Sequence, residues 1–262
     1  MPPVTLLTDF DDFYVGAMKG VVSSITDSPV HDVYHSVPRH SIRAGAFALV
    51  NVAPYYPEGT VHCVVVDPGV GTDRSAVVVE AGEQYLVGPD NGVLIPPARE
   101  LDDGFDVYEL PYDDSETESN TFHGRDLFAP AAARIAEEGV DSVAGETTDD
   151  YVDMSFGRSG FDDAGTLDCE VIYVDGFGNV VTDVPSEEIF ERAEYGSRIT
   201  VDGEELPFER AYASVPEESL LCTVGSHGNL EIGVNQGSAG DRLGIEAGDT
   251  VTVEIAETGE GD

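Results

Sequence analysis

The chain has 262 residues, of which 41% are hydrophobic, so it is long enough for one large domain or two modest ones. Its 52 acidic residues outnumber its 12 basic residues and give a formal net charge of −40. A field of that sign repels nucleic acid and anionic membrane surfaces, so we expect neither as a partner.

The first half of the chain alternates strand-like and helix-like segments, which predicts an α/β fold with a mostly parallel sheet. Val15, Met18 and Val22 have helical spacing, Ser41 stands where it can cap a second helix, and Gly139 stands where it can end a third. In chain order, we expect strand 4–10, helix 14–25, strand 30–37, helix 41–56, the apolar segments 62–67, 75–80 and 84–94, strand 105–110 and helix 125–138.

The second half has a different pattern. Residues 141–165 are acidic and rich in glycine, which is typical of a linker. Nearly everything beyond them is strand-like, with one short helix at 186–193 and a hairpin turn at Asp202-Gly203. We therefore expect an α/β domain at 1–150, a linker at 151–165 and a smaller all-β, barrel-like domain at 166–262.

Polar side chains follow several predicted strands of the first half. In "HCVVVDPGVGTDRSAVVVE", Asp67 ends one strand and Arg74 precedes the next, while Asp9 and the loop around Asp90 occupy similar places. Ligands of open α/β sheets bind outside the carboxyl ends of the strands, so these residues are candidates for a site. "GVGTDR" is not a dinucleotide fingerprint, because Arg74 stands where the third glycine belongs.

Two other clusters have open interpretations. "DFDD" after the first strand fits a divalent cation, a carboxylate pair that grips a vicinal diol, or solvated acids. His31, His35 and His40 lack the spacing of a known metal motif, so we expect no metal site.

The cysteines are far apart and form no CxxC pair, and we expect buried core thiols at Cys63, Cys169 and Cys222.

"TESNTFHGRDLFAPAAARIA" places His123 directly before a helix, where backbone N–H groups favour a polar or anionic group. Taken alone, such a histidine is more often a cap or a surface group. Three strings in order, "LLTDF…DFYVGAMKG", "VVVDPGVGTDR" and "NTFHGRDLFAPAAA", change that interpretation. With "LVGPDNGVL", "VDGFGNVVTDV" and "NLEIGVNQGSA", the chain resembles, over nearly its whole length, the S-adenosylmethionine hydrolases, also called hydroxide adenosyltransferases, which are relatives of the fluorinase and chlorinase.

The resemblance implies a homotrimer whose active sites lie between the N-terminal domain of one subunit and the C-terminal domain of the next. It implies a nucleophilic water held by Asp67, Arg74 and His123, and a ribose diol held by Asp9. It also implies that the substrate-binding set is completed by Gly124, in place of the fluorinase's halide-binding serine, and by Asp175, Phe177, Asn179, Tyr212, Asn235, Gln236, Ser238 and Ala239. The chain departs from the family in a shorter loop after Asp9 and in His40, where the fluorinase has an aromatic residue.

The activity implied is hydrolysis of S-adenosyl-L-methionine to adenosine and L-methionine by attack of water on ribose C5′. A sulfonium leaves as a neutral thioether, so we expect neither cofactor nor metal. Asp67 or His123 is expected to take the proton of the water, with Arg74 fixing the carboxylate. The alternatives are a non-catalytic S-adenosylmethionine or adenosine-binding protein and a metal-dependent nucleosidase that uses the "TDFDD" aspartates.

The acidic residues are scattered from Asp9 to Asp262, and Lys19 is the only lysine. This distribution favours a halophilic protein over an acidic tail or an acidic mesophilic protein. The N-terminus "MPPVTLLTDFDD" has no basic leader pattern, so we expect a cytoplasmic location.

The net charge of −40 predicts that folding and subunit assembly weaken as salt falls. The screening length grows from about 3 Å at about 1 M salt to about 30 Å at about 0.01 M, so self-repulsion of the acids increases. Melting temperature and sedimentation measured across this range test the expectation. Identical values at both ends would contradict the halophilic interpretation.

Overall fold

The computed structural model describes residues 1–112, 121–156 and 160–255. The chain forms two compact units, Met1–Ser155 and Phe156–Asp262. Parts of the predicted linker and of the predicted C-terminal domain, residues 157–159 and 256–262, lie outside the described residues. In the described part of the chain, no helix is long and apolar enough to cross a bilayer.

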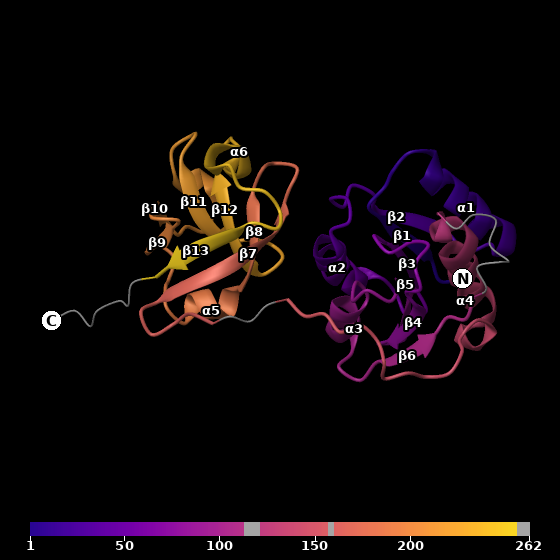
Figure 1. The fold of residues 1–262 in the computed structure, drawn as a ribbon. Coiled ribbons are helices and arrows are strands. Elements are labelled where there is room, and N and C mark those ends of the chain that lie inside the picture. Colours follow the sequence, from indigo (N-terminus) through magenta and orange to yellow (C-terminus); the bar gives the residue numbers. More distant parts are fainter. Residues whose placement is uncertain (113–120, 157–159, 256–262) are drawn as a thin grey trace. The chain divides into compact units, whose positions relative to one another are not determined.

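The first unit is a layered α/β structure around a six-stranded sheet of order β2-β1-β3-β5-β4-β6 (Figure 1). Helices α1 and α4 cover one face of the sheet, and α2 and α3 cover the other. The strands are β1 (Val4–Thr8), β2 (Val30–Tyr34), β3 (Val61–Val65), β4 (Ala76–Ala81), β5 (Gln84–Pro89) and β6 (Asp106–Glu109). The α-helices are α1 (Phe13–Ile25), α2 (Ile42–Val50), α3 (Ile95–Leu101) and α4 (Ala129–Glu138), and short helical turns are formed by Ala53–Tyr55, Gly124–Phe128 and Val140–Ser142.

This sheet is mixed, so the expectation of a mostly parallel sheet is confirmed only in part. The pairs β1–β2, β1–β3 and β3–β5 are parallel, whereas β4 runs antiparallel to both β5 and β6. The reason is a tight turn between β4 and β5 at Gly82 and Glu83, both of which have positive φ angles, of 55° and 62°. Such a two-residue turn joins antiparallel neighbours and leaves no room for a crossover helix.

Several local predictions are confirmed. The Ser41 side chain accepts from the Ala44 N–H over 3.3 Å at the start of α2, and Gly139, with a φ of 90°, ends α4. The helix predicted at 41–56 is shorter in the structure, where α2 ends at Val50. Pro54 cannot continue a helix, and a short turn at Ala53–Tyr55 follows instead. Helix α3 was missed, since Pro96 and Pro97 resemble breakers although both lie in its first turn, where proline is tolerated.

The second unit is a seven-stranded sheet of order β10-β9-β13-β7-β8-β12-β11, and its named pairs are all antiparallel. A bridge between Phe208 and Cys222 links its two ends, so the sheet is nearly closed like a barrel. Asp202 and Gly203, with φ angles of 47° and 83°, form the predicted hairpin turn. The elements are β7 (Thr166–Val174), β8 (Val180–Pro185), α5 (Ser186–Phe190), β9 (Arg198–Val201), β10 (Glu204–Pro207), β11 (Leu220–Val224), β12 (Asn229–Val234), the unpredicted α6 (Ala239–Leu243) and β13 (Thr250–Glu254), with a short turn at Tyr212–Ser214.

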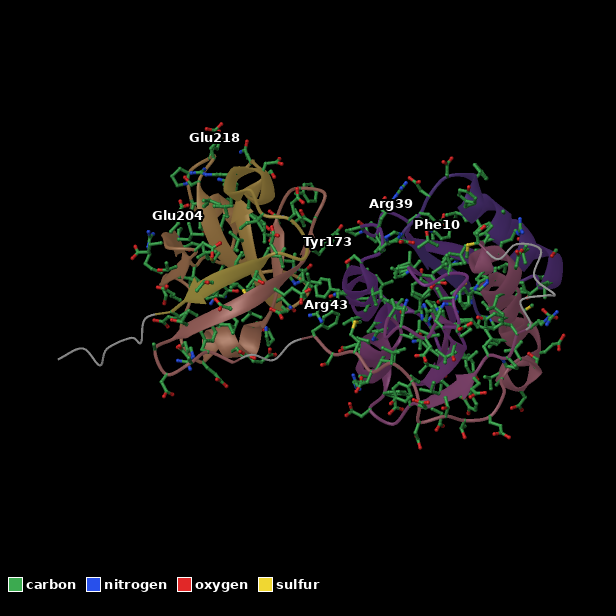
Figure 2. The ribbon with its side chains drawn as sticks, viewed as in Figure 1. Phe10, Arg39, Arg43, Tyr173, Glu204 and Glu218 are labelled. Carbon is green, nitrogen blue, oxygen red and sulfur yellow. The ribbon has the colours of Figure 1, made fainter. Side chains whose placement is uncertain are left out.

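The two units have separate apolar cores, and the acidic side chains lie mostly outside them. Glu204 and Glu218 are exposed examples in the second unit (Figure 2). The three thiols are buried as expected, and burial raises the pKa of Cys63, Cys169 and Cys222 to about 12 each. They are therefore inert core groups.

His62 is a polar group inside the first core. Both hydrogens of the Gln84 amide nitrogen go to the carbonyls of Ala53 and Tyr56, at 3.3 and 3.2 Å, so the amide oxygen faces His62 Nε2 at 2.6 Å. His62 Nε2 must then donate, which leaves Nδ1 to accept from the Thr5 hydroxyl at 2.8 Å. This arrangement holds the ring neutral, and burial lowers the pKa of His62 from 6.5 to about 4 against the opposing effect of Gln84.

The buried His62 predicts a loss of stability in mild acid. Below the ordinary pKa the unfolded chain binds a proton that the folded chain does not, so stability falls as pH drops from 6.5 toward about 4. Between about pH 7 and about pH 5 the loss due to this group amounts to about 2 kcal/mol. Chemical denaturation at constant high salt measures the unfolding free energy at both pH values. The decrease from the higher to the lower pH should be smaller in His62→Gln than in the wild-type protein by the contribution of His62. His31→Gln, at an exposed position, should keep the wild-type slope, and parallel curves for all three proteins would contradict the assignment.

Candidate active site

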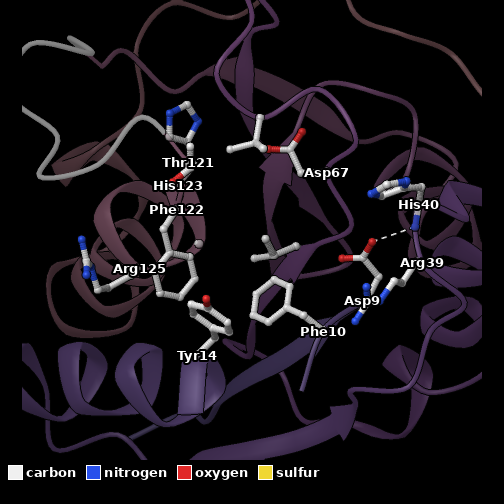
Figure 3. Close-up of a pocket in the computed structure, with 13 residues that line it drawn as sticks. Asp9, Phe10, Tyr14, Arg39, His40, Asp67, Thr121, Phe122, His123 and Arg125 are labelled. Atoms are coloured by element: carbon white, nitrogen blue, oxygen red, sulfur yellow. Dashed lines mark hydrogen bonds between the residues drawn. The ribbon is translucent and has the colours of Figure 1, made fainter. Parts of the chain in front are cut away.

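A cavity of about 680 Å³ opens at the carboxyl ends of the parallel strands β1 and β3 in the first unit. Asp9 follows β1 and Asp67 follows β3, so the parallel pairing places both carboxylates at one edge of the sheet. Figure 3 shows their side chains with that of His123 around the cavity. The lining consists of Asp9, Phe10, Tyr14, Arg39, His40, Val65, Asp67, Val70, Thr121, Phe122, His123, Gly124 and Arg125.

The loop between β3 and β4 folds back on itself and brings Arg74 to Asp67. The Val70 N–H donates to the Asp67 carbonyl over 3.3 Å, and the Thr72 N–H donates to the Gly69 carbonyl over 3.1 Å. A Cβ atom at Gly69 would lie 3.3 Å from Arg74 Cγ and 3.4 Å from the Thr72 hydroxyl, so glycine permits this tight approach. The predicted placement of Asp67 after one strand and Arg74 before the next is confirmed.

Arg74 is the centre of the site. Its Nε donates to Asp67 Oδ1 over 3.0 Å, and its Nη2 donates to the other carboxylate oxygen and to His123 Nδ1, the latter over 3.0 Å. Nη1 donates to the Ser75 carbonyl over 3.0 Å, and the guanidinium carbon lies 5.2 Å from the centre of the Phe128 ring. The side chains of Arg74 and Asp67 are only 11% and 5% exposed, so this is a buried, two-pronged ion pair.

His123 reaches this pair from the turn that precedes α4. Its ring is 1% exposed and meets the Tyr112 ring edge to face at 5.4 Å. Because a guanidinium only donates hydrogen bonds, Nδ1 of His123 must accept from Arg74, and the neutral ring carries its proton on Nε2. The structure therefore brings Asp67, Arg74 and His123 together and also assigns the tautomer of the histidine.

Asp9 lies on another part of the cavity wall. Its Oδ2 accepts from the His40 backbone N–H over 2.8 Å (dashed line in Figure 3), and its own N–H donates to the Val65 carbonyl over 3.4 Å. This carboxylate is thus held in place by backbone groups.

Asp11 and Asp12 do not line the cavity. Asp90 does not line it either: its carboxylate accepts from the Val152 N–H over 2.8 Å, and burial raises its pKa.

An aromatic wall accompanies these polar groups, and the sequence had not indicated it. Phe10 packs edge to face on Tyr14 and Phe122, with ring centres 6.2 and 5.9 Å apart, and Arg125 lies 5.3 Å over Phe122. The three rings come from the residues just after β1, from α1 and from the segment before α4, so only the fold brings them together. Their combination with carboxylates suits a ligand that has both a flat apolar part and hydroxyl groups.

A second cavity, of about 900 Å³, belongs to the second unit. Six residues that the family resemblance implies for substrate binding line it, namely Asp175, Phe177, Asn179, Tyr212, Gln236 and Ser238. Asn235 and Ala239 do not: the Asn235 amide donates to the Val215 carbonyl over 2.8 Å, and Ala239 is fully buried. The Asp175 carboxylate accepts from the N–H groups of Phe177 and Asn179, at 2.8 and 2.9 Å, and so shapes the loop itself.

Glu231 is a further group in this cavity that the sequence did not indicate. The Tyr212 hydroxyl donates to its Oε1, and His227 Nε2 lies 3.1 Å from its Oε2. His227 Nδ1 accepts from the Asn229 N–H over 3.2 Å, so Nε2 is the protonated donor. Burial first, and then Glu231 and Asp175, raise the pKa of Tyr212 and keep the phenol neutral. An acid inside the buried strand segment "NLEIGV" was the available signal.

Among residues 1–112, 121–156 and 160–255, no group of three or more histidine, cysteine or acidic side chains is arranged to hold a metal ion. His31, His35 and His40 do not converge: His31 packs on Tyr56, whereas His35 binds Asp32.

Two family models match the chain in succession. Residues 4–144 match the N-terminal domain of the SAM hydroxide adenosyltransferases, and residues 169–252 match their C-terminal domain. The chain is 36% identical to an (R)-S-adenosyl-L-methionine hydrolase of Thermus thermophilus, over 95% of this chain and 98% of that protein. It is 25% identical to a fluorinase of Nocardia brasiliensis, over 97% of both chains.

The fold is similar to a solved one. A conserved protein of Thermotoga maritima superimposes with a TM-score of 0.82 at 32% sequence identity, covering 95% of this chain and 99% of that one.

Proposed function

The chain belongs to the SAM hydroxide adenosyltransferase family, and we propose that it hydrolyses S-adenosyl-L-methionine to adenosine and L-methionine at the cavity that Asp67, Arg74 and His123 border. The single observation that carries the assignment of the site is the buried contact of Arg74 with both Asp67 and His123. It places a carboxylate, fixed in one orientation, at the edge of a cavity that combines aromatic and hydroxyl-binding groups.

In the proposed reaction a water molecule attacks C5′ of the ribose. The C5′–S bond breaks, its electron pair stays on sulfur, and methionine leaves as a neutral thioether, so no general acid is needed. Asp67 accepts the proton that the water loses and releases it to solvent. We assign this step to Asp67 rather than His123 because the hydrogen bond from Arg74 already occupies His123 Nδ1. The role of His123 is then to fix the guanidinium of Arg74.

Asp9 holds the ribose diol in this scheme. Each carboxylate oxygen can accept two hydrogen bonds, so Oδ2 can accept a hydroxyl group as well as the His40 N–H.

The second-unit cavity supplies Tyr212 as a flat surface for adenine, with Asn179, Gln236 and Ser238 around it. S-Adenosylmethionine is then the substrate, and the reaction uses no cofactor or metal, because positioning and exclusion of bulk water suffice for displacement at a sulfonium.

We propose further that the active protein is a homotrimer in which the first unit of one subunit meets the second unit of its neighbour. The split of the candidate substrate-binding residues between two cavities supports this. So does the exposure of apolar side chains beside them: Phe177 is 82% exposed, Phe13 69% and Tyr14 43%. The halophilic character and the cytoplasmic location stay predictions from the sequence.

Gly124 supports water over halide as the nucleophile. A Cβ atom there would lie 3.2 Å from Met18 Sδ and 3.3 Å from both Phe122 and Val65. A serine at this place would therefore force its neighbours to shift, so the site is packed for glycine, which offers no hydroxyl group to a halide.

The products test the proposed function. Purified protein in high salt, incubated with S-adenosylmethionine and no added metal, should form adenosine and methionine in equal amounts. Chromatography separates this outcome from its competitors. Free adenine would indicate a nucleosidase, 5′-chloro- or 5′-fluoroadenosine a halogenase, and unchanged substrate a binding protein; each of these contradicts the proposal.

Substitutions should separate chemistry from binding. Asp67→Ala should lower kcat by roughly 10²- to 10⁴-fold with little change in KM, because it removes the proton acceptor. Asp9→Ala should instead raise KM by roughly ten- to a hundredfold, the value of hydrogen bonds to a charged group. Asp73→Asn, at an exposed acid beside Arg74, is the matched control and should behave like wild type.

Two substitutions at His123 distinguish fixing the guanidinium from taking the proton. Asparagine can accept from Arg74 through its amide oxygen but cannot act as a base, whereas alanine can do neither. We therefore expect His123→Asn to retain a larger kcat than His123→Ala. Equal and severe losses in both variants would show that His123 is the base.

A further inference from the structure

The pairing of β1 with β2 contains an irregularity next to the candidate site. Leu6 lies opposite Asp32, but Leu7 lies opposite Tyr34, so Val33 is an extra residue in β2. Bulges are rare in parallel pairs and occur next to active sites, where they redirect a side chain. Here the shift carries His35 to the level of Thr8, the residue before Asp9.

A chain of polar contacts begins at that point. The hydroxyl of Thr8, which is fully buried, lies 2.8 Å from His35 Nδ1 and also contacts the Phe10 carbonyl oxygen. His35 Nε2 lies 2.9 Å from Asp32 Oδ1, and Asp32 Oδ2 accepts from Lys19 Nζ over 2.6 Å. The only lysine of the chain is thus used here.

Counting hydrogens fixes the state of His35. The Thr8 hydroxyl has one hydrogen, and the Phe10 carbonyl can only accept, so that hydrogen lies between these two oxygens. The hydrogen between Thr8 and His35 must then come from Nδ1.

The other ring nitrogen is a donor as well. Burial acts to raise the pKa of Asp32, but hydrogen bonds and charges of Lys19 and His35 outweigh it, so the pKa lies below its usual value. Asp32 is therefore a carboxylate and only accepts, which requires a hydrogen on His35 Nε2. Both nitrogens of His35 donate, and the ring is an imidazolium.

We propose that His35 is a positioning residue of the hydrolase, acting as an imidazolium that holds Thr8 and, through it, the backbone of Asp9 and Phe10 at the cavity. This inference rests on the proposed function for its effect on catalysis, but not for the protonation state. Around the ring, α1 contributes Lys19, β2 contributes Asp32, and the end of β1 contributes Thr8, with Asp9 next in the chain. A neutral ring would lack one donor. Either Nε2 would lose its hydrogen bond to Asp32, or Thr8 would have to release the Phe10 carbonyl to donate to Nδ1.

Nitrogen-15 spectra of the histidine side chains test the protonation state without any substrate. Near neutral pH, the signal that disappears in His35→Gln should come from a ring with two protonated nitrogens. The same signal should become that of a neutral ring in Asp32→Asn, because the carboxylate that stabilises the imidazolium is gone. A ring with one bare nitrogen in the wild-type protein would overturn the inference, whether or not the protein hydrolyses S-adenosylmethionine.

Kinetics test the positioning role. Thr8→Val and Asp32→Asn should each raise KM for S-adenosylmethionine by roughly tenfold and change kcat less, because Asp9 loses its fixed place. His31→Gln, on the same strand, is the control and should leave both constants unchanged. Wild-type KM values in folded Thr8→Val and Asp32→Asn would overturn the positioning role while leaving the proposed hydrolysis intact.

Discussion

The two-pronged hydrogen bonding of Arg74 to Asp67 is the interaction on which the rest of the site depends. Both side chains are nearly buried, and a buried charge is tolerated only when it is paired and its remaining hydrogen-bonding groups are satisfied. The chain meets this condition with the Ser75 carbonyl, the Phe128 ring and His123 Nδ1. The three proposed catalytic residues therefore form one unit, in which the loss of any member leaves an uncompensated group.

The two cavities differ in the chemistry that they offer. The first combines carboxylates, cations and the Phe10, Tyr14 and Phe122 rings, which suits a reacting sugar. The second is built from loop amides around Tyr212, whose ring is oriented by Glu231. Under the proposed function the first performs the chemistry and the second recognises the rest of the substrate. Binding energy gathered away from the reacting carbon can then be used to align it.

Much of the fold was predictable because local signals agree with the global structure. The Ser41 cap, the Gly139 helix end and the Asp202-Gly203 turn are all determined by near neighbours. The parallel strands were predicted but the reversal of β4 was not, because its direction depends on the two-residue turn at Gly82 and Glu83, which a pattern of apolar runs does not reveal. The residue types of the site came from the family resemblance. The contact of Arg74 with Asp67 was expected as well, but its contact with His123 was not, since Arg74 meets His123 across 49 positions of sequence and the tautomer follows only from that contact.

The most direct test of the central claim is the fate of the solvent oxygen. In water enriched in oxygen-18, attack at C5′ delivers the labelled oxygen to the sugar and leaves the bond between adenine and ribose intact. Mass spectrometry of the adenosine formed from S-adenosylmethionine should therefore find the label in the 5′-hydroxyl group. Unlabelled adenosine, or label at C1′ together with free adenine, would contradict a water held by Asp67, Arg74 and His123 as the nucleophile.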